Sequence, residues 1–257
     1  MHILIFGASG HVGTGLARHL SASHRITGVV RSQPVARAPY APVLVPDWVD
    51  RPRSVIDELT RTDAQRVDAV IAAVGGWYVD EAMIDRGIAS FDKDYSSYLR
   101  SHFAACAVTQ ALADSGTRTE AGARADAGAS AEADRSAESE ASAEADRSAE
   151  SEASAEAGRS EQIRHLTLNG VASVEACVGS GAISVFGAAQ EMLLRVAAAE
   201  SRSVLFRELK VMAPIGGDDR NDLSGGVETI GMSAVADAAG EVLSRPGDFE
   251  LTTQLKV

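Results

Sequence analysis

The chain opens on a short apolar run followed by three spaced glycines, and it reads HILIFGASGHVG over His2–Gly13. The apolar run predicts a buried strand, and a helical pattern begins directly after the last glycine. Glycines at such a strand-to-helix turn allow a tight bend and let a pyrophosphate approach the backbone, where free N–H groups and the helix dipole face it. We therefore expect a dinucleotide here, with a glycine turn that binds no ligand as the alternative. The residues expected to hold it are Gly7, Ser9, Gly10, His11, Val12 and Gly13.

Apolar stretches alternate with helical patterns along the rest of the chain. Strands are expected at 2–6, 25–30, 43–45, 69–74, 163–171, 204–211 and 249–255, and helices at 12–20, 54–61, 95–113, 188–200 and 233–243. Strands that alternate with amphipathic helices predict a parallel sheet with helices on both faces. The predicted fold class is α/β, a single doubly wound Rossmann-like domain.

The end of the second expected strand bears on the choice of cofactor. An acidic residue there would accept hydrogen bonds from the adenosine ribose hydroxyls, but the chain reads Gly28-Val29-Val30-Arg31. A guanidinium can pair with a 2′-phosphate, which a carboxylate would repel. Arg31 therefore predicts that NADP(H) is preferred over NAD(H), with an ordinary solvated arginine as the alternative.

A low-complexity segment interrupts the alternation. Ser115–Glu161 contains nothing more apolar than Ala, and the run ASAEADRSAESE occurs at Ala129–Glu140 and again at Ala141–Glu152. A period of 12 residues advances about 120° per repeat on a helix, so no continuous apolar stripe forms. Without a stripe, little offsets the entropy of ordering, and we expect a solvated, disordered insertion within one domain. A duplication without a specific role and an interaction tail both remain open.

Composition restricts the partners and the compartment. The net charge of −12 is concentrated in the repeat segment, which holds 12 acidic and 5 basic residues, and no basic stripe points to nucleic acid as a partner. No apolar run reaches the about 18 residues of a membrane span, and the glycine turn leaves no room for a signal peptide. Cys106 and Cys177 lie in apolar surroundings. They are expected to be reduced and buried, which favours a cytoplasmic protein.

An aspartate and a glycine pair complete a pattern that begins with the glycine turn. Asp47 follows the third expected strand, and Gly75 and Gly76 follow the fourth. In these features the chain resembles the short-chain dehydrogenase/reductase family over all of its length except the insertion, and its glycine spacing is closer to the extended or atypical branches. The resemblance implies that Asp47 contacts the adenine and that Gly75 and Gly76 let the cofactor lie close. It also implies a homodimer or homotetramer, in which helices matching 95–113 and 188–200 pair with their copies.

The same resemblance points to the catalytic positions. The family's Ser follows the fifth strand, its Tyr comes about a dozen residues later, and its Lys follows after four more residues. The best match places Ser173 on the Ser, Phe186 on the Tyr and Gln190 on the Lys. Phe has no transferable proton and Gln carries no charge, although Gln190 could still hydrogen-bond a ribose. A second register places Ile183 and Gly187 on the Tyr and the Lys.

Other side chains are candidates to replace the missing acid. His102 lies where the family often has an Asn that holds a proton-relay water, and an imidazole titrates in the useful range. Trp77 and Tyr78 follow the fourth strand, where either could line a pocket. A structural role is the alternative for each of them. No Gly-x-Ser-x-Gly elbow and no histidine spacing typical of a metal site occur in the sequence.

Two functions are consistent with these observations. The first is a divergent NADP(H)-dependent oxidoreductase that acts on a small carbonyl or alcohol. The second is a non-catalytic NADP(H)-binding sensor or partner subunit. The family resemblance favours the first, whereas Phe186 and Gln190 favour the second. If the first register holds, Phe186→Tyr combined with Gln190→Lys should raise ketone reduction.

Overall fold

The computed structural model describes residues 1–34, 37–62, 66–76, 78–131, 162–217 and 228–257, with the backbone alone over 117–131. Within these residues, seven strands form one parallel sheet in the order β3-β2-β1-β4-β5-β6-β7. The doubly wound α/β fold predicted from the sequence is therefore confirmed. The strands are β1 (His2–Phe6), β2 (Arg25–Val30), β3 (Ala41–Leu44), β4 (Ala69–Ala72), β5 (Ile163–Gly170), β6 (Val204–Val211) and β7 (Thr252–Leu255).

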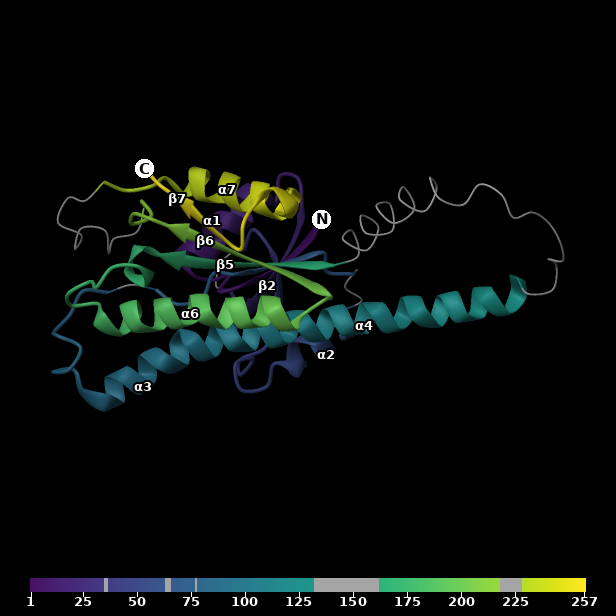
Figure 1. The fold of residues 1–257 in the computed structure, drawn as a ribbon, viewed down its shortest axis with the longest axis horizontal. Helices are drawn as coiled ribbons and strands as arrows, with labels where there is room; N and C mark the ends of the chain where they lie inside the picture. Colours follow the sequence, from purple (N-terminus) through teal and green to yellow (C-terminus); the bar gives the residue numbers. More distant parts are fainter. Residues whose placement is uncertain (35–36, 63–65, 77, 132–161, 218–227) are drawn as a thin grey trace, which may run out of the picture.

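Helices cover both faces of the sheet (Figure 1). The helices of one face are α1 (His11–Leu20) and α7 (Met232–Ser244), and those of the other are α2 (Arg53–Arg61), α4 (Leu99–Ala131) and α6 (Gly181–Glu200). Helix α3 leads into α4, and two short 3-10 turns follow β5 and α7. These three elements are α3 (Gly87–Ser97), η1 (Val171–Ser173) and η3 (Pro246–Asp248).

The central strand β1 is buried along its whole length because helices cover both sides of it. Ile3 and Ile5 belong to the core under α1 and α7, whereas Leu4 and Phe6 belong to the core under α2 and α4. Successive side chains of a strand point to opposite faces, so a continuous apolar run fills both cores at once.

The strand order places a ligand crevice beside β1. Strands β2 and β3 lie on one side of β1, and β4 to β7 lie on the other. The connections after β1 and β4 therefore diverge to opposite faces of the sheet, and ligands of doubly wound folds bind in the gap that opens at the carboxyl ends of these strands. The glycine turn follows β1 directly, so it lies at this crevice.

The helices expected at 12–20, 54–61 and 233–243 are found to within one residue, whereas those expected at 95–113 and 188–200 differ by more. The helix expected over 95–113 is two helices, α3 and α4, with a break at Tyr98, whose backbone has φ −104° and ψ −86°. Helix α4 also continues to Ala131, because an Ala- and Glu-rich sequence favours helix. The backbone of 115–131 is thus helical, and the remainder of the predicted disordered insertion, 132–161, lies outside the described residues. Helix α6 starts at Gly181 rather than 188, since the low helix propensity of Gly181 and Gly187 concealed its first turns.

Helix α6 is long and apolar enough to cross a membrane by length and composition, although no apolar run of that length was expected. Ala182 and Leu194 of this helix are buried, and the helix packs against β5 and β6. Its opposite side exposes Val185, Met192 and Val196. We therefore regard α6 as a core helix with an apolar outer face.

The far end of α4 leaves the body of the molecule and runs past the sheet (Figure 1). A helix that follows a strand returns toward the amino ends of the sheet, away from the cofactor crevice. We expect that replacing 117–160 with a short Gly/Ser linker leaves Tm within a few degrees and NADPH affinity unchanged. A thermal melt and an NADPH titration check this. A large fall in Tm would show that the segment packs on the core.

Candidate dinucleotide cleft

A cleft of about 770 Å³ opens at the carboxyl ends of the central strands. Its walls are the first turn of α1, the loop after β4, the end of β5 with η1, one side of α6, and the loop after β6. The cleft thus occupies the crevice that the strand order creates, and it begins at the glycine turn.

The glycines of this turn are required by close packing of the backbone. Gly7 has φ +79°, and a Cβ on it would overlap the backbone oxygen of Ala73. A Cβ on Gly13 would overlap the backbone oxygen of Gly7, so the helix and the strand approach this closely only with glycine at both positions. Gly10 caps α1 without a side-chain hydrogen bond, and the first turn holds no acidic residue. An anion in the cleft would satisfy the amide groups of this helix end.

The residues predicted for the cofactor turn divide into two groups. Gly10, His11 and Val12 line the cleft, whereas Ser9 is exposed beside it. His11 Nε2 lies 3.1 Å from the backbone oxygen of Gly216, so its ring joins α1 to the loop after β6. Gly7 and Gly13 do not line the cleft. They shape it through the close backbone contact described above.

Arg31 and Asp47 lie at the same edge of the sheet, on the side of β2 and β3. Arg31 directly follows β2 and is exposed. The Asp47 carboxylate accepts a hydrogen bond from Arg51, and the next residue, Trp48, packs on Phe6 with ring centroids 4.6 Å apart. Strands β2 and β3 lie on one side of β1 in the sheet. The adenosine end of an extended dinucleotide would therefore lie toward Arg31 and Asp47.

Gly75 and Gly76 line the opposite wall, together with a residue that the sequence did not single out. Gly75 has φ +98°, and a Cβ on it would come within 2.7 Å of the Tyr98 ring. The Tyr98 hydroxyl accepts a hydrogen bond from the Gly76 N–H at 2.9 Å. Tyr98 reaches the cleft because the chain breaks between α3 and α4 at this residue, and a prediction of one continuous helix gave no sign of the break.

Ser173 and Gln190, the residues placed on the catalytic Ser and Lys, both donate side-chain hydrogen bonds to backbone oxygens. Ser173 Oγ donates to the backbone oxygen of Gly170 at 2.8 Å inside the η1 turn, and Ser173 does not line the cleft. Gln190 does line the cleft, but its Nε2 donates to the backbone oxygen of Leu168 at 2.9 Å. The Ser173 hydroxyl is therefore turned away from the position that a substrate oxygen would take.

Phe186, placed on the catalytic Tyr, lies in an aromatic cluster between α6 and α3. Its ring centroid is 4.7 Å from that of Phe91 and 5.9 Å from that of Tyr95. The side chain is buried there and does not line the cleft. Residue 186 of α6 therefore faces α3 and not the cleft in this structure, and the register that matches Phe186 to the Tyr stays a prediction.

The second register agrees with the helix face that the cleft exposes. Ile183 and Gly187 are four residues apart on α6, and both line the cleft. Gly170 lines it thirteen residues before Ile183, at the end of β5. A Cβ on Gly187 would lie 3.1 Å from Ser173 and 3.2 Å from the Asn169 side-chain oxygen. The space beside the helix backbone at this position is therefore already filled.

His102 is a core residue. It is 1% exposed and does not line the cleft. Burial lowers the pKa of His102 to about 4, and a hydrogen bond with the Val74 backbone opposes that shift. Burial, and then the nearby His102, lower the pKa of His165 to about 3. His102 is therefore neutral at pH 7, so it has no imidazolium proton to donate, and it lies outside the cleft.

Tyr78 is bound to a group of charged side chains beside the cleft. Its hydroxyl donates to Asp94 Oδ2 at 2.5 Å and accepts from Arg86, which is itself paired with Asp94 at 2.9 Å. Burial and then the Asp94 hydrogen bond raise the pKa of Tyr78 to about 12. The Tyr78 hydroxyl therefore has a structural role, linking the loop after β4 to Arg86 and Asp94.

The other candidate of this loop, Trp77, lies outside the described residues.

A buried ionic network holds the floor of the cleft. Asn169 Nδ2 donates to Glu208 at 2.7 Å and to the backbone oxygen of Gly187 at 2.9 Å. Lys210, which is 2% exposed, pairs with Glu191 of α6 at 2.5 Å. Burial raises the pKa of Glu208, and the Asn169 hydrogen bond opposes that shift. The network fixes α6 against β5 and β6.

Cys177 departs from the predicted burial. Cys106 is buried, but Cys177 is half-buried and lines the cleft. Within the described residues no group of three or more His, Cys, Asp or Glu side chains is arranged to hold a metal ion.

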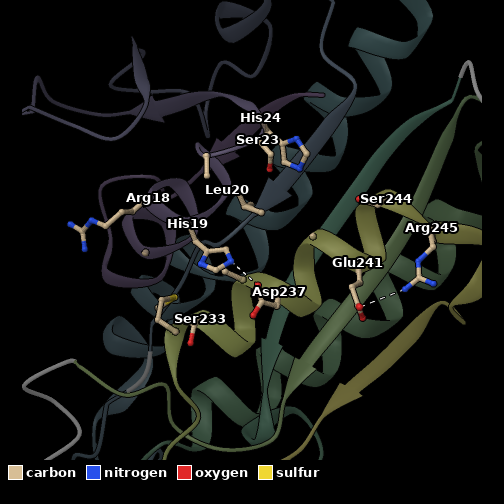
Figure 2. Close-up of a pocket in the computed structure, with 15 residues that line it drawn as sticks. Arg18, His19, Leu20, Ser23, His24, Ser233, Asp237, Glu241, Ser244 and Arg245 are labelled. Atoms are coloured by element: carbon tan, nitrogen blue, oxygen red, sulfur yellow. Dashed lines mark hydrogen bonds and ion pairs between the residues drawn. The ribbon is translucent and has the colours of Figure 1, made fainter.

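A second, more open cleft lies between α1 and α7 on the other face of the sheet. Figure 2 shows its two ion pairs, His19 with Asp237 and Glu241 with Arg245, at 2.6 and 3.5 Å. The side chains of both pairs are at least two-fifths exposed, where such pairs contribute little. This cleft has neither the glycine turn nor the strand ends, so we regard it as the groove between two packed helices.

Comparison with known proteins identifies the fold. No family model matches the chain, and no curated protein matches it. Among solved structures, a short chain dehydrogenase/reductase family protein is 15% identical with a TM-score of 0.67, and the match covers 99% of this chain and 95% of that one. A short chain dehydrogenase from Mycobacterium avium is 14% identical with a TM-score of 0.66, covering 99% and 81%. An NADH-dependent reductase solved in complex with NAD is 15% identical with a TM-score of 0.65, covering 100% and 94%. The chain therefore has the fold of short-chain dehydrogenases, as its sequence resemblance predicted.

The burial of His102 generates a prediction about acid stability. An unfolded histidine binds a proton below about pH 6.5, whereas folded His102 does so only near pH 4. The free energy of unfolding should therefore fall as pH drops from 6.5 to 4. We expect His102→Leu to change the free energy of unfolding little at pH 7, since the buried ring is uncharged there. We also expect it to weaken the dependence of that free energy on pH, because one proton-binding group is removed. Urea unfolding at several pH values checks this, and an unchanged slope would contradict it.

Proposed function

We propose that the protein binds NADP(H) in this cleft and does not carry out ordinary carbonyl reduction, so that it acts as a redox-state sensor or as a cofactor-binding partner subunit. One observation carries the proposal: Gly170, Ile183 and Gly187 line the cleft at the spacing that the resemblance implies for the family's Ser, Tyr and Lys. None of these side chains holds a transferable proton or a charge.

The residues around the glycine turn fit a dinucleotide. The backbone contact of Gly7 and Gly13 leaves a cradle with no Cβ, and the uncapped end of α1 offers amide groups to a pyrophosphate. Arg31 would face a 2′-phosphate, and Asp47 would face the adenine. The Gln190 carboxamide oxygen would accept a hydrogen bond from a ribose hydroxyl. When bound, the nicotinamide supplies hydride chemistry, and the protein must supply the proton.

At the family's spacing, the cleft offers no side chain that could supply this proton. Reduction of a carbonyl produces an alkoxide, which needs a donor within about 3 Å at the transition state. Ile183 is apolar, Gly170 and Gly187 have no side chain, and the Ser173 hydroxyl is committed to its own turn. General acid catalysis of this kind typically raises a reaction rate by about 10²- to 10⁴-fold. Its loss is therefore consistent with a protein that binds the cofactor without reducing a carbonyl.

One observation favours the alternative, a divergent NADP(H)-dependent oxidoreductase for a small carbonyl or alcohol. Tyr98 lines the cleft, and its hydroxyl accepts a hydrogen bond from the Gly76 N–H. If the protein is a reductase, Tyr98 is the donor to test. Tyr98→Phe would then abolish turnover while cofactor binding persists.

Arg31 gives the first prediction for this proposal. We expect wild type to bind NADPH more tightly than NADH, and Arg31→Asp to lower NADPH affinity by roughly 10- to 100-fold, since a charged hydrogen-bonding pair is lost and a repulsion is added. Arg31→Gln, which removes the charge alone, is the intermediate control. Titration by fluorescence or calorimetry checks this. Equal affinities in wild type, or a preference for NADH, would show that Arg31 does not select the cofactor.

The second prediction concerns turnover. We expect wild type to bind NADPH yet reduce no ketone or aldehyde of a broad panel above the rate of free NADPH. We also expect Phe186→Tyr with Gln190→Lys to remain inert, because residue 186 faces Phe91 and Tyr95. NADPH consumption and product analysis check both. Fast turnover in wild type, or a gain in the double variant, would contradict the proposal.

The third prediction concerns assembly. Helices α4 and α6 pack against each other and expose Phe103, Met192 and Val196 on their outer side. We propose that these residues pair with a second copy, and we expect a dimer or tetramer by light scattering at micromolar concentration. Phe103→Glu should dissociate it, whereas Leu44→Glu, an exposed leucine at the far edge strand, should not. A wild-type monomer would reject this assembly.

A further inference from the structure

Tyr98 lies at the junction of two helices, and both of them hold its backbone. Its N–H donates to the backbone oxygen of Asp94 at 2.9 Å, a bond that belongs to the end of α3. Its own backbone oxygen accepts the His102 N–H at 3.0 Å, which is a bond of the first turn of α4. The break between the helices, with ψ −86°, lies at this same residue. Tyr98 is therefore fixed at a bend of the chain, and from there its side chain reaches the cleft.

The Tyr98 side chain holds the loop after β4 through two different contacts. Its hydroxyl accepts a hydrogen bond from the Gly76 N–H at 2.9 Å. Its ring lies against Gly75, where an added Cβ would come within 2.7 and 2.8 Å of two ring carbons. Gly75 has φ +98°, a conformation that other residues rarely adopt, so the loop turns sharply at this position. The hydroxyl and the ring thus contact adjacent residues of one turn.

A second side chain of α4 holds the same loop. His102, one helical turn after Tyr98, is buried and makes a hydrogen bond with the Val74 backbone. Val74, Gly75 and Gly76 all line the cleft. Three consecutive residues of the cleft wall are therefore held from the start of α4, the first by a core residue and the other two by Tyr98.

The sheet order relates this wall to one half of a dinucleotide. Strand β4 lies on the side of β1 away from β2 and β3. Arg31 and Asp47 follow β2 and β3, so the adenosine half of a bound dinucleotide would lie on their side. The loop after β4 would then face the other half, which ends in the nicotinamide.

We propose that Tyr98 is a positioning residue for the nicotinamide half of the dinucleotide. It keeps Gly75 and Gly76 in the turn that shapes the cleft wall before any ligand arrives. A loop that samples other conformations lowers the apparent affinity by the fraction of molecules that are competent to bind. A side chain that orders the loop in the free protein therefore strengthens binding. This inference rests on the proposed function, because it takes NADP(H) as the ligand of the cleft.

Removal of the hydroxyl alone tests the contact with Gly76. We expect Tyr98→Phe to weaken NADPH binding by roughly three- to tenfold, the effect of losing one hydrogen bond. Tyr98→Ala, which also removes the ring from Gly75, should weaken it further. Tyr95→Phe is the matched control, because Tyr95 is exposed on α3 and does not line the cleft. It should leave the NADPH affinity, measured by fluorescence titration, unchanged.

A shorter ligand shows whether the effect belongs to this wall. 2′,5′-ADP carries the adenosine and the 2′-phosphate of NADPH without the nicotinamide riboside, so it would reach Arg31 and the glycine turn only. Tyr98→Phe should leave the affinity for 2′,5′-ADP nearly unchanged. Equal losses for 2′,5′-ADP and NADPH would contradict the proposal, since a general disturbance of the cleft weakens both ligands.

Amide exchange gives a readout in the free protein. Hydrogen exchange at the Gly76 N–H, followed by NMR, should be faster in Tyr98→Phe than in wild type. The amide of Ile71, which is buried within β4, should exchange at the same rate in both. An unchanged Gly76 rate would overturn the proposal.

The NADPH titration separates this inference from the proposed function. If wild type binds NADPH and Tyr98→Phe binds it equally well, the positioning role of Tyr98 falls and the proposed function stands. If wild type binds no NADPH, the proposed function falls, and the positioning role falls with it.

Discussion

The approach of the backbone at the end of β1 is the constraint on which the rest of the cleft depends. Gly7 approaches the backbone oxygen of Ala73 after β4, and Gly13 of α1 approaches the backbone oxygen of Gly7, at distances that no other residue type allows. Because this contact fixes where α1 begins, it also fixes where the uncapped amide groups open onto the crevice. In the proposed complex, the sheet order would direct the adenosine end toward β2 and the nicotinamide end toward β5 and α6.

The side of the cleft formed by η1 and α6 is built from packing interactions. Phe186 joins an aromatic cluster with α3, and Asn169 and Ser173 fill the space beside Gly187. The ion pair of Lys210 with Glu191 joins β6 to α6, and the hydrogen bond from Asn169 to Glu208 joins β5 to β6. These contacts fix the position of α6 beside the cleft.

Much of the fold could be predicted from the sequence, because strong local signals determine it. The apolar run of β1, the spacing of Gly7, Gly10 and Gly13, and the alternation of strands and helices led to the correct sheet class. The orientation of α6 could not be predicted in the same way. Gly181 and Gly187 concealed its first turns, and three residues along the helix separate Ile183, which lines the cleft, from Phe186, which packs on α3. Tyr98 was missed because its position depends on a backbone break between two helices.

The most direct test of this account is a crystal structure of the protein with NADP⁺ bound. We predict the pyrophosphate at the amide groups of Gly10–Val12 and the nicotinamide ring against Ile183 and Gly170. Phe186 should remain between Phe91 and Tyr95. A cofactor whose nicotinamide ring contacts Phe186 or the Ser173 hydroxyl, or a glycine turn that stays empty at saturating NADP⁺, would contradict the account.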